Sequence, residues 1–187
     1  MAELKGLFQR ALDRYGQLVH AVRDDQWHDQ TPCTEWDVSM LVNHLVYENL
    51  WMPPLLEGKT IADVGDSLDG DLLRDDPKSA WDGAAAQVSP SVQAVPLDRP
   101  VSLSYGVVPA EHYIFELFTD LTIHGWDLAE AIGADKTLDP ESVDLLYSHY
   151  KPREDALKAS GLFGSKIVPV PGADRQTELL AVFGREA

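Results

Sequence analysis

A long helical repeat of apolar residues, from Pro109 to Ile132, is the feature that most constrains the fold. Apolar side chains recur there on most sides of a helix; they are Tyr113, Phe115, Leu117, Phe118, Leu121, Ile123, Trp126, Leu128 and Ala129. Pro109 suits the first turn of a helix, and Gly133 suits its carboxyl-terminal cap. At about 1.5 Å per residue the helix would be about 36 Å long. Because other elements must cover so apolar a helix, we place it at the centre of the molecule.

Three other segments have the helical spacing needed to cover it. The pattern predicts helices over residues 4–22 and 79–95, and a third from about Thr34 to Trp51 that Pro53 and Pro54 would end. Thr34 and Asp37 are spaced as in a capping box at the start of that helix. Residues 101–105 alternate apolar and polar side chains, which predicts a short strand or extended arm.

The carboxyl-terminal residues carry weaker patterns. They predict a helix over residues 140–159 that Pro152 interrupts, an extended run over 167–170 and a short helix over 174–183. We therefore expect an all-α protein. Residues 1–135 would form a four-helix bundle, and residues 136–187 a small α/β appendage packed on the same domain.

Composition and charge limit the partners of this chain. Its formal net charge of −16 disfavours binding to nucleic acid and to an anionic membrane surface. No apolar run approaches the ~20 residues that span a bilayer, and the first residues lack the apolar core of a signal peptide. We therefore expect a cytoplasmic protein. A single cysteine, Cys33, excludes an internal disulfide and a cysteine-rich zinc site.

Asp120 and His124 lie four residues apart on the long helix, so they share one face within ~6 Å at Cβ. A carboxylate and an imidazole at this spacing can chelate one divalent metal, or they can form a hydrogen-bonded pair without a metal. Asp127 lies three residues beyond His124, where it could orient the imidazole or face solvent.

His44 lies among apolar residues of the second predicted helix, so it should point inward. By itself it could be an ordinary hydrogen-bonded core histidine. Together with Asp120 and His124 it completes a set of two imidazoles and one carboxylate, with room for water or substrate. Zn²⁺ suits such a set, and Ni²⁺, Fe²⁺ and Mn²⁺ are alternatives.

Cys33 precedes the predicted start of that helix, where a helix amino terminus can lower the pKa of a thiol. No basic residue lies near it in the sequence, which favours a packed, inert cysteine. The neighbouring Trp36 and Asp37 would pack and cap at the helix entrance.

Residues 31–37, 41–46 and 120–129 together resemble actinobacterial proteins related to mycothiol-dependent maleylpyruvate isomerase. That group belongs to the DinB/YfiT-like superfamily of metal-binding four-helix bundles. The stretches 161–171 and 179–184 are also similar to an uncharacterised branch of it, so the resemblance covers nearly the whole chain.

In the isomerase, a histidine on the second helix and a Glu-x-x-x-His motif on a later helix hold zinc. The resemblance thus implies His44, Asp120 and His124 as ligands, with Asp120 one methylene shorter than the usual glutamate. The isomerase also has a separate carboxyl-terminal domain needed for its activity, and this chain is too short to match that domain in full.

The resemblance implies a metal-dependent thiol S-transferase or isomerase. The metal would hold mycothiol, or a similar low-molecular-weight thiol, as the thiolate that attacks a small electrophile. A metal-dependent hydrolase is one alternative. A non-catalytic metal- or ligand-binding protein is another, and a fourth ligand from Glu48, His112 or Cys33 would favour it. Because bundles of this kind often associate, a homodimer is a further expectation for this chain.

Overall fold

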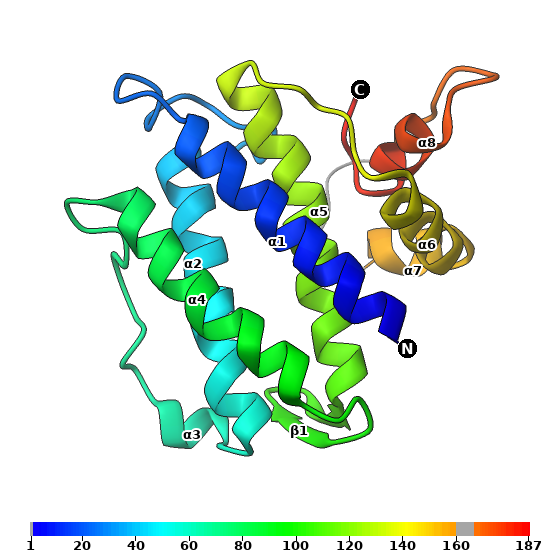
Figure 1. Ribbon diagram of the computed structural model, residues 1–187. Helices are drawn as coiled ribbons and strands as arrows, with labels where there is room; N and C mark the ends of the chain where they lie inside the picture. The colour runs from blue at the N-terminus through cyan, green and yellow to red at the C-terminus, as the bar shows by residue number, and fades with distance from the viewer. Residues whose placement is uncertain (1, 160–166) are drawn as a thin grey trace. The chain divides into compact units, whose positions relative to one another are not determined.

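The computed structural model describes residues 2–159 and 167–187, and the chain divides into two compact units, Met1–Asp135 and Lys136–Ala187. The first unit consists mainly of four long helices (Figure 1). They are α1 (Ala2–Ala21), α2 (Val38–Glu57), α4 (Pro77–Ala94) and α5 (Ala110–Ile132). A short helix α3 (Ile61–Val64) and a hairpin of β1 (Pro100–Leu103) and β2 (Gly106–Pro109) complete this unit.

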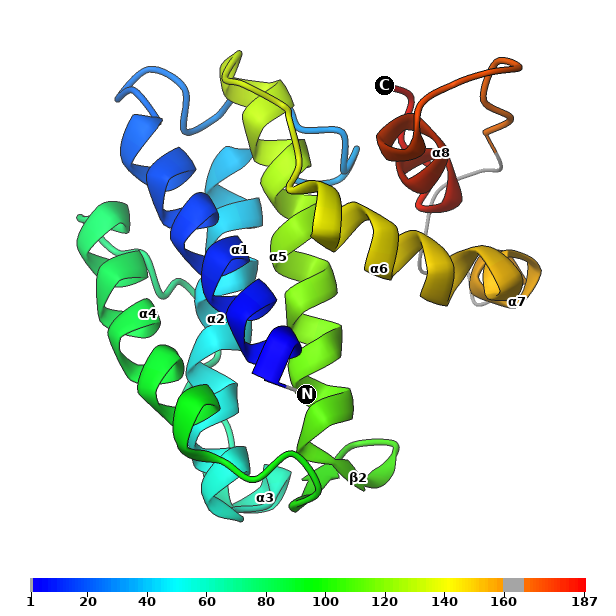
Figure 2. The same ribbon diagram turned by 45° about the vertical axis from the view of Figure 1, so that its right-hand side comes forward.

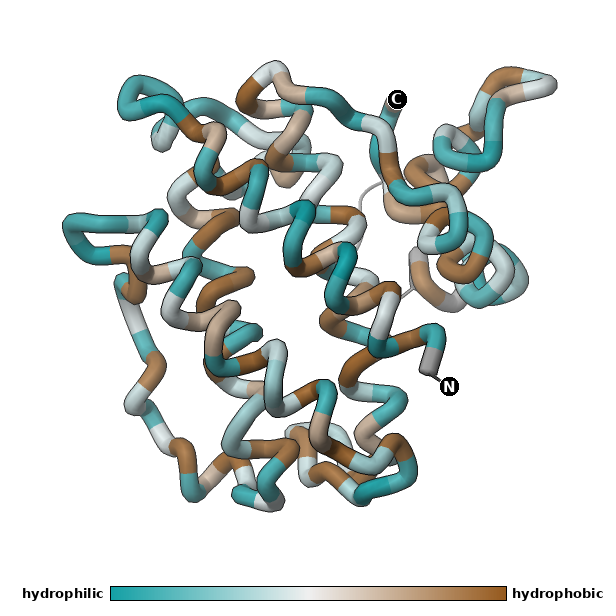
Figure 3. The backbone as a smooth tube through the Cα atoms, in the orientation of Figure 1, coloured by the Kyte–Doolittle hydropathy of each residue, from teal (hydrophilic) through white to brown (hydrophobic). Residues whose placement is uncertain are grey.

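The four long helices enclose one hydrophobic core. Helices α1 and α2 each pack against both α4 and α5, so the helices form a closed ring (Figure 2). Hydrophobic positions recur along each of these helices between hydrophilic ones (Figure 3). One fully buried side chain from each helix illustrates the core: Phe8, Leu45, Val88 and Phe118. Most residues of α5 are buried, as its apolar sequence predicts.

A glycine lets α1 approach α4 closely. A Cβ atom on Gly16 would lie only 2.8 Å from Nε1 of Trp81, which is buried on α4. The Trp81 ring also packs against the Tyr15 ring, with centroids 4.7 Å apart. A side chain at position 16 would therefore push the two helices apart.

Helix α2 differs from its prediction at both ends. Its cap is Asp37, whose side chain accepts a hydrogen bond from the Met40 amide at 2.8 Å, so the expected capping box at Thr34 is wrong. The helix also continues through Pro53 and Pro54 to Glu57, and Gly58 caps it with φ 103°. Each proline removes a helical hydrogen bond. The helix nevertheless continues, because Met52, Leu55 and Leu56 are buried in the core and their packing stabilises it.

The predicted strand is present as β1. It pairs antiparallel with β2, and Val101 lies opposite Val108. Strand β2 was not predicted, because Pro109 suggested that α5 would begin there. Pro109 instead ends β2 and occupies the cap position before α5, with φ −62° and ψ 147°.

The second unit contains helices α6 (Pro140–Tyr150), α7 (Glu154–Ala159) and α8 (Arg175–Val182), with a 3-10 turn at Lys151–Arg153 between the first two. That turn contains Pro152 and confirms the predicted interruption. Residues 167–170 form no strand, so the described part of this unit is helical rather than α/β. Pro169 has no N–H to donate to a partner strand. Residues 161–166 of the family-like stretch lie outside the described residues, and the packing of this unit on the bundle stays a prediction.

Among the described residues, none of the helices combines the length and the apolar character required to cross a lipid bilayer.

Candidate metal centre

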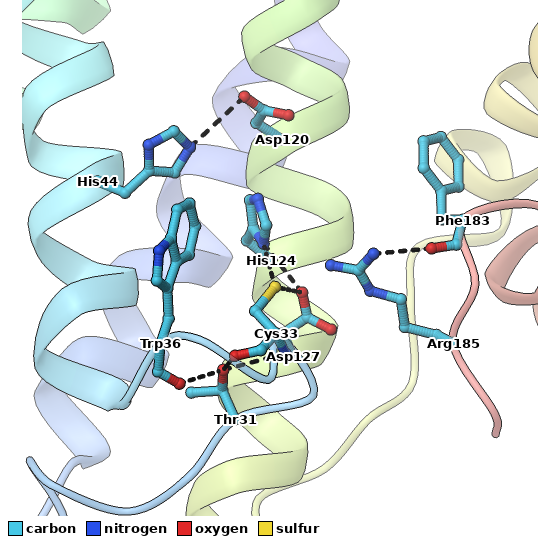
Figure 4. Close-up of polar contacts among 9 residues, drawn as sticks. All are labelled: Thr31, Cys33, Trp36, His44, Asp120, His124, Asp127, Phe183 and Arg185. Atoms are coloured by element: carbon cyan, nitrogen blue, oxygen red, sulfur yellow. Dashed lines mark hydrogen bonds and ion pairs between the residues drawn. The ribbon is translucent and has the colours of Figure 1, made fainter. Parts of the chain in front are cut away.

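His44 on α2 and the pair Asp120 and His124 on α5 come together between the two helices (Figure 4). The His44 Nε2 atom lies 3.9 Å from the Asp120 Oδ2 atom. The centroids of the two imidazole rings are 5.4 Å apart, and the rings are nearly perpendicular at 85°. The three residues predicted from the sequence thus lie near one another in the structure. That they bind a metal stays a prediction.

Nitrogen and oxygen donors of this kind suit a divalent metal. Ligand atoms about 2.0–2.2 Å from zinc in tetrahedral geometry lie roughly 3.3–3.6 Å from each other. The His44–Asp120 separation of 3.9 Å lies just above that range. The donor types therefore suit a metal, but among the described residues His44 and Asp120 belong to no group of three ligand atoms within 4.8 Å of one another, so a metal here would draw the side chains closer together.

A pocket of about 600 Å³ opens beside His44. Its lining includes Trp36, Asn43 and Tyr47, together with Gly70 from the loop before α4. Asn43 holds that loop, because its Nδ2 donates to the Gly70 carbonyl at 3.2 Å and its Oδ1 accepts from the Leu72 amide at 2.8 Å. The pocket has the size of a small-molecule site.

Asp127 fixes the orientation of the His124 ring. Its Oδ2 atom lies 2.9 Å from His124 Nδ1, and its side chain is completely buried. A carboxylate accepts hydrogen bonds, so Nδ1 carries the proton and Nε2 keeps its lone pair for a metal. Of the two alternatives for Asp127, orienting the imidazole agrees with the structure and facing solvent does not.

Cys33 adds a second possible set of ligands. Its Sγ atom lies 3.8 Å from His124 Nδ1 and 3.4 Å from Asp127 Oδ2. The ligand atoms of Cys33, His124 and Asp127 all lie within 4.8 Å of one another, so this triad could hold a metal ion. Sequence reasoning missed it, because 91 and 94 residues separate Cys33 from these partners along the chain.

The two candidate sites use opposite edges of the same ring. Figure 4 shows the His124 ring between Cys33 and Asp127 on one side and Asp120 and His44 on the other. A metal at the Cys33 triad would take Nδ1 and displace its hydrogen bond to Asp127. A metal with His44 and Asp120 would take Nε2 and leave that hydrogen bond intact.

Trp36 forms a wall of the centre instead of only packing at the helix entrance. Its ring centroid lies 4.7 Å from that of His44 and 5.8 Å from that of His124. The Thr31 hydroxyl donates to the Trp36 carbonyl at 2.8 Å and accepts from the Cys33 amide at 3.1 Å. Residues 31–37 are thus a folded loop that places Trp36 and Cys33 at the centre.

The other residues considered as a fourth ligand have different surroundings. His112 is about half exposed, and its Nε2 lies 3.3 Å from Glu116 Oε1. Burial raises the pKa of Glu48, and the nearby His44 opposes this rise. Neither residue belongs to a compact three-ligand group among the described residues.

Comparison with known proteins establishes the family. Residues 8–129 match the family model described as the mycothiol maleylpyruvate isomerase N-terminal domain. The chain belongs to this family. The match spans the bundle and includes His44, Asp120, His124 and Asp127, which confirms the family suggested by the sequence motifs.

Two relatives of this chain carry names that describe them as uncharacterised. Proteins MT0763 and Rv0738, from two strains of Mycobacterium tuberculosis, are each 34% identical to this chain over 139 residues. The match covers 71% of this chain and 69% of each relative. Neither name assigns an activity.

A solved structure shares the fold. The crystal structure of the mycothiol-dependent maleylpyruvate isomerase matches with a TM-score of 0.63 at 15% sequence identity. The match covers 82% of this chain and 72% of that one. This similarity confirms the predicted mostly helical fold.

Proposed function

We propose that this chain is a metal-dependent enzyme that uses mycothiol, or a similar low-molecular-weight thiol, to modify a small electrophile. The reaction class is thiol S-transfer or thiol-assisted isomerisation. The observation that carries the proposal is the approach of His44 to Asp120 and His124, together with a pocket of about 600 Å³ that His44 lines. Membership of the family supports the choice of a thiol.

In this proposal His44, the Nε2 atom of His124 and the Asp120 carboxylate hold one divalent metal. Zn²⁺ is the first choice for such ligands, and Ni²⁺, Fe²⁺ and Mn²⁺ also suit them. When bound, the metal would supply a positive charge that lowers the pKa of the substrate thiol and favours its thiolate.

The chain's own residues orient the ligands and shape the site. Asp127 keeps the proton on His124 Nδ1, and Trp36 packs against both imidazoles. The side chains of His44 and Asp120 are 24% and 36% exposed, which gives a thiol access to the centre. In transfer, the sulfur–carbon bond would form as the leaving group departs with its electron pair. In isomerisation, the thiol would add to the substrate and leave again after bond rotation.

A thiol-conjugation assay tests the proposal, with mycothiol and other thiols offered to a panel of electrophiles. We expect activity that His44→Ala and His124→Ala each reduce by at least about 100-fold, because each removes a proposed ligand. Cys33→Ser is the matched control, since it changes a neighbour of the centre, and we expect it to stay within about threefold of the unchanged protein. Full activity in the metal-free protein would refute the metal–thiol mechanism.

The compact triad of Cys33, His124 and Asp127 favours a second candidate, a non-catalytic metal-binding protein. A metal there would depend on Cys33 and not on His44. The same variants therefore separate the two candidates. If Cys33→Ser loses the metal while His44→Ala retains it, the non-catalytic candidate is favoured.

A further inference from the structure

A second pocket lies one helical turn away from the candidate metal centre. It has a volume of about 360 Å³ and lies between α2, α5 and the hairpin. Glu48 follows His44 by one turn on α2, and Glu116 precedes Asp120 by one turn on α5. Four aromatic residues and these two carboxylates supply most of its wall: Tyr47, Trp51, Tyr105, Tyr113, Glu48 and Glu116.

The charge of this pocket is negative. Glu48 and Glu116 line it, and no lysine or arginine occurs among the described residues of its lining. Burial raises the pKa of Glu48, and the negative charges of Asp120 and Glu116 add to this rise. Water therefore solvates the Glu48 carboxylate poorly, and a cation placed beside it would be attracted more strongly than at an exposed site.

Glu116 is held in place at the rim of the pocket. Its Oε2 atom accepts a hydrogen bond from the Tyr105 hydroxyl at 2.7 Å, and its Oε1 atom lies 3.3 Å from His112 Nε2. Burial raises the pKa of both Tyr105 and Tyr113, so these phenols stay neutral. The two carboxylates therefore provide the negative charge of the pocket.

The aromatic walls suit an organic cation. The rings of Tyr47 and Trp51 meet at 63° with centroids 5.9 Å apart, as two adjoining sides of a cage. Aromatic faces attract ammonium ions, and a cage of them is a common way to bind quaternary ammonium groups. The Trp51 indole N–H is buried and has no hydrogen-bond partner among the described residues.

We propose that this pocket binds a small organic ammonium ion. An anion would be repelled by both carboxylates. A neutral apolar ligand would leave Glu48 desolvated without compensation. The pocket contains none of the three proposed metal ligands, so this inference does not depend on the proposed function.

Calorimetric titration of the metal-free protein tests the proposal. The probes are choline and 3,3-dimethyl-1-butanol, which have the same shape and differ in the positive charge. We expect choline to bind at least about tenfold more tightly than the alcohol, which corresponds to about 1.4 kcal/mol. Equal affinity for the two probes, or no saturable binding of choline, would overturn the proposal.

Variants locate the binding site. Glu48→Gln and Glu116→Gln should each weaken choline binding by at least about fivefold, because each removes one charge from the wall. Glu57→Gln makes the same change on an exposed part of α2 outside this pocket, and it should leave the affinity unchanged. Equal effects of Glu57→Gln and Glu48→Gln would show that only the general negative charge attracts choline, and would overturn the site. His44→Ala should leave choline binding intact even if it abolishes metal binding.

Discussion

The two ring nitrogens of His124 have different neighbours, and this division determines which chemistry the centre can support. Nδ1 lies 2.9 Å from the buried Asp127 carboxylate and 3.8 Å from the Cys33 sulfur. The other edge of the ring faces His44 and Asp120 (Figure 4). Because Asp127 accepts the Nδ1 proton, we assign the metal-binding lone pair to Nε2.

Asp127→Asn tests this assignment. A neutral amide can present its NH₂ group to Nδ1, which would shift the proton to Nε2 and remove the lone pair from the metal. We expect metal affinity to fall by about 10–100-fold. The measurement is competition with a chelator, and a thermal melt of the metal-free protein separately reports folding. An affinity equal to that of the unchanged protein, with folding intact, would show that Asp127 does not position His124.

The sequence predicted His44, Asp120 and His124 as neighbours for different reasons. Asp120 and His124 follow from helical spacing, which is a local property. His44 was placed beside them because it lies on an apolar face of a second bundle helix, and the resemblance to a known family implied the same set. Cys33 and Trp36 reach the centre through the folded loop 31–37, and spacing within the sequence carries no information about that contact.

At the scale of the elements, local patterns predicted helices well wherever a core-facing repeat was strong. Helix α5 begins one residue after the expected position and ends as expected, because Gly133 adopts the left-handed conformation with φ 69°. Helix α2 passes through Pro53 and Pro54, because burial of its last turn outweighs the local preference for a break. Strand β2 escaped prediction because Pro109, its last residue, suggested the start of α5.

Gly16→Ala tests the close contact between α1 and α4. The added methyl group would lie 2.8 Å from Trp81 Nε1, so the variant should lose about 1–3 kcal/mol of unfolding free energy despite alanine's better helix propensity. Gly83→Ala on α4 is the control. Nothing lies within 4 Å of its new methyl group, and it should gain about 0.5–1 kcal/mol. Chemical denaturation measures both, and a stabilised Gly16→Ala would contradict the packing described.

Asp76→Ala tests the cap of α4 through its pH dependence. The Ser79 side chain and amide donate to the Asp76 carboxylate and hold its pKa below the ordinary value of 3.8. A lowered folded pKa adds stability that is fully present above pH 3.8 and is lost as the pH falls through the folded pKa.

The Asp76→Ala variant should therefore melt below the unchanged protein at pH 7, and the gap should narrow in acid below the folded pKa. The control is Asp75→Ala, at the exposed neighbouring residue. A gap that stays constant over the whole pH range would rule out a contribution from the Asp76 charge.

At the scale of the whole molecule, the net charge of −16 has a measurable consequence. Like charges repel one another in the compact state, and salt screens this repulsion. Raising NaCl from about 0.01 to 1 M shortens the Debye length from about 30 to 3 Å, so the melting temperature of the metal-free protein should rise. A fall of the melting temperature over this range would show that favourable ion pairs outweigh the repulsion.

The global fold was accessible from sequence because a few strong helical repeats and one set of motifs agreed with one another. The apolar residues of those repeats form the hydrophobic core of the bundle. The family model matches residues 8–129, which include most of these repeats. For residues 167–170 the local pattern had no helical repeat to support it. Their apolar run favoured a strand, but a strand needs a partner, and none pairs with them among the described residues.

The location of the metal is the central claim, and Co²⁺ tests it most directly. The spectrum of Co²⁺ added to metal-free, untagged protein, with no thiol present, reports its ligands, because a cysteine thiolate adds an intense near-ultraviolet charge-transfer band. We predict saturable visible bands without the thiolate band, lost in His44→Ala and retained in Cys33→Ser. A thiolate band that disappears in Cys33→Ser and persists in His44→Ala would contradict the account and move the metal to the Cys33 triad.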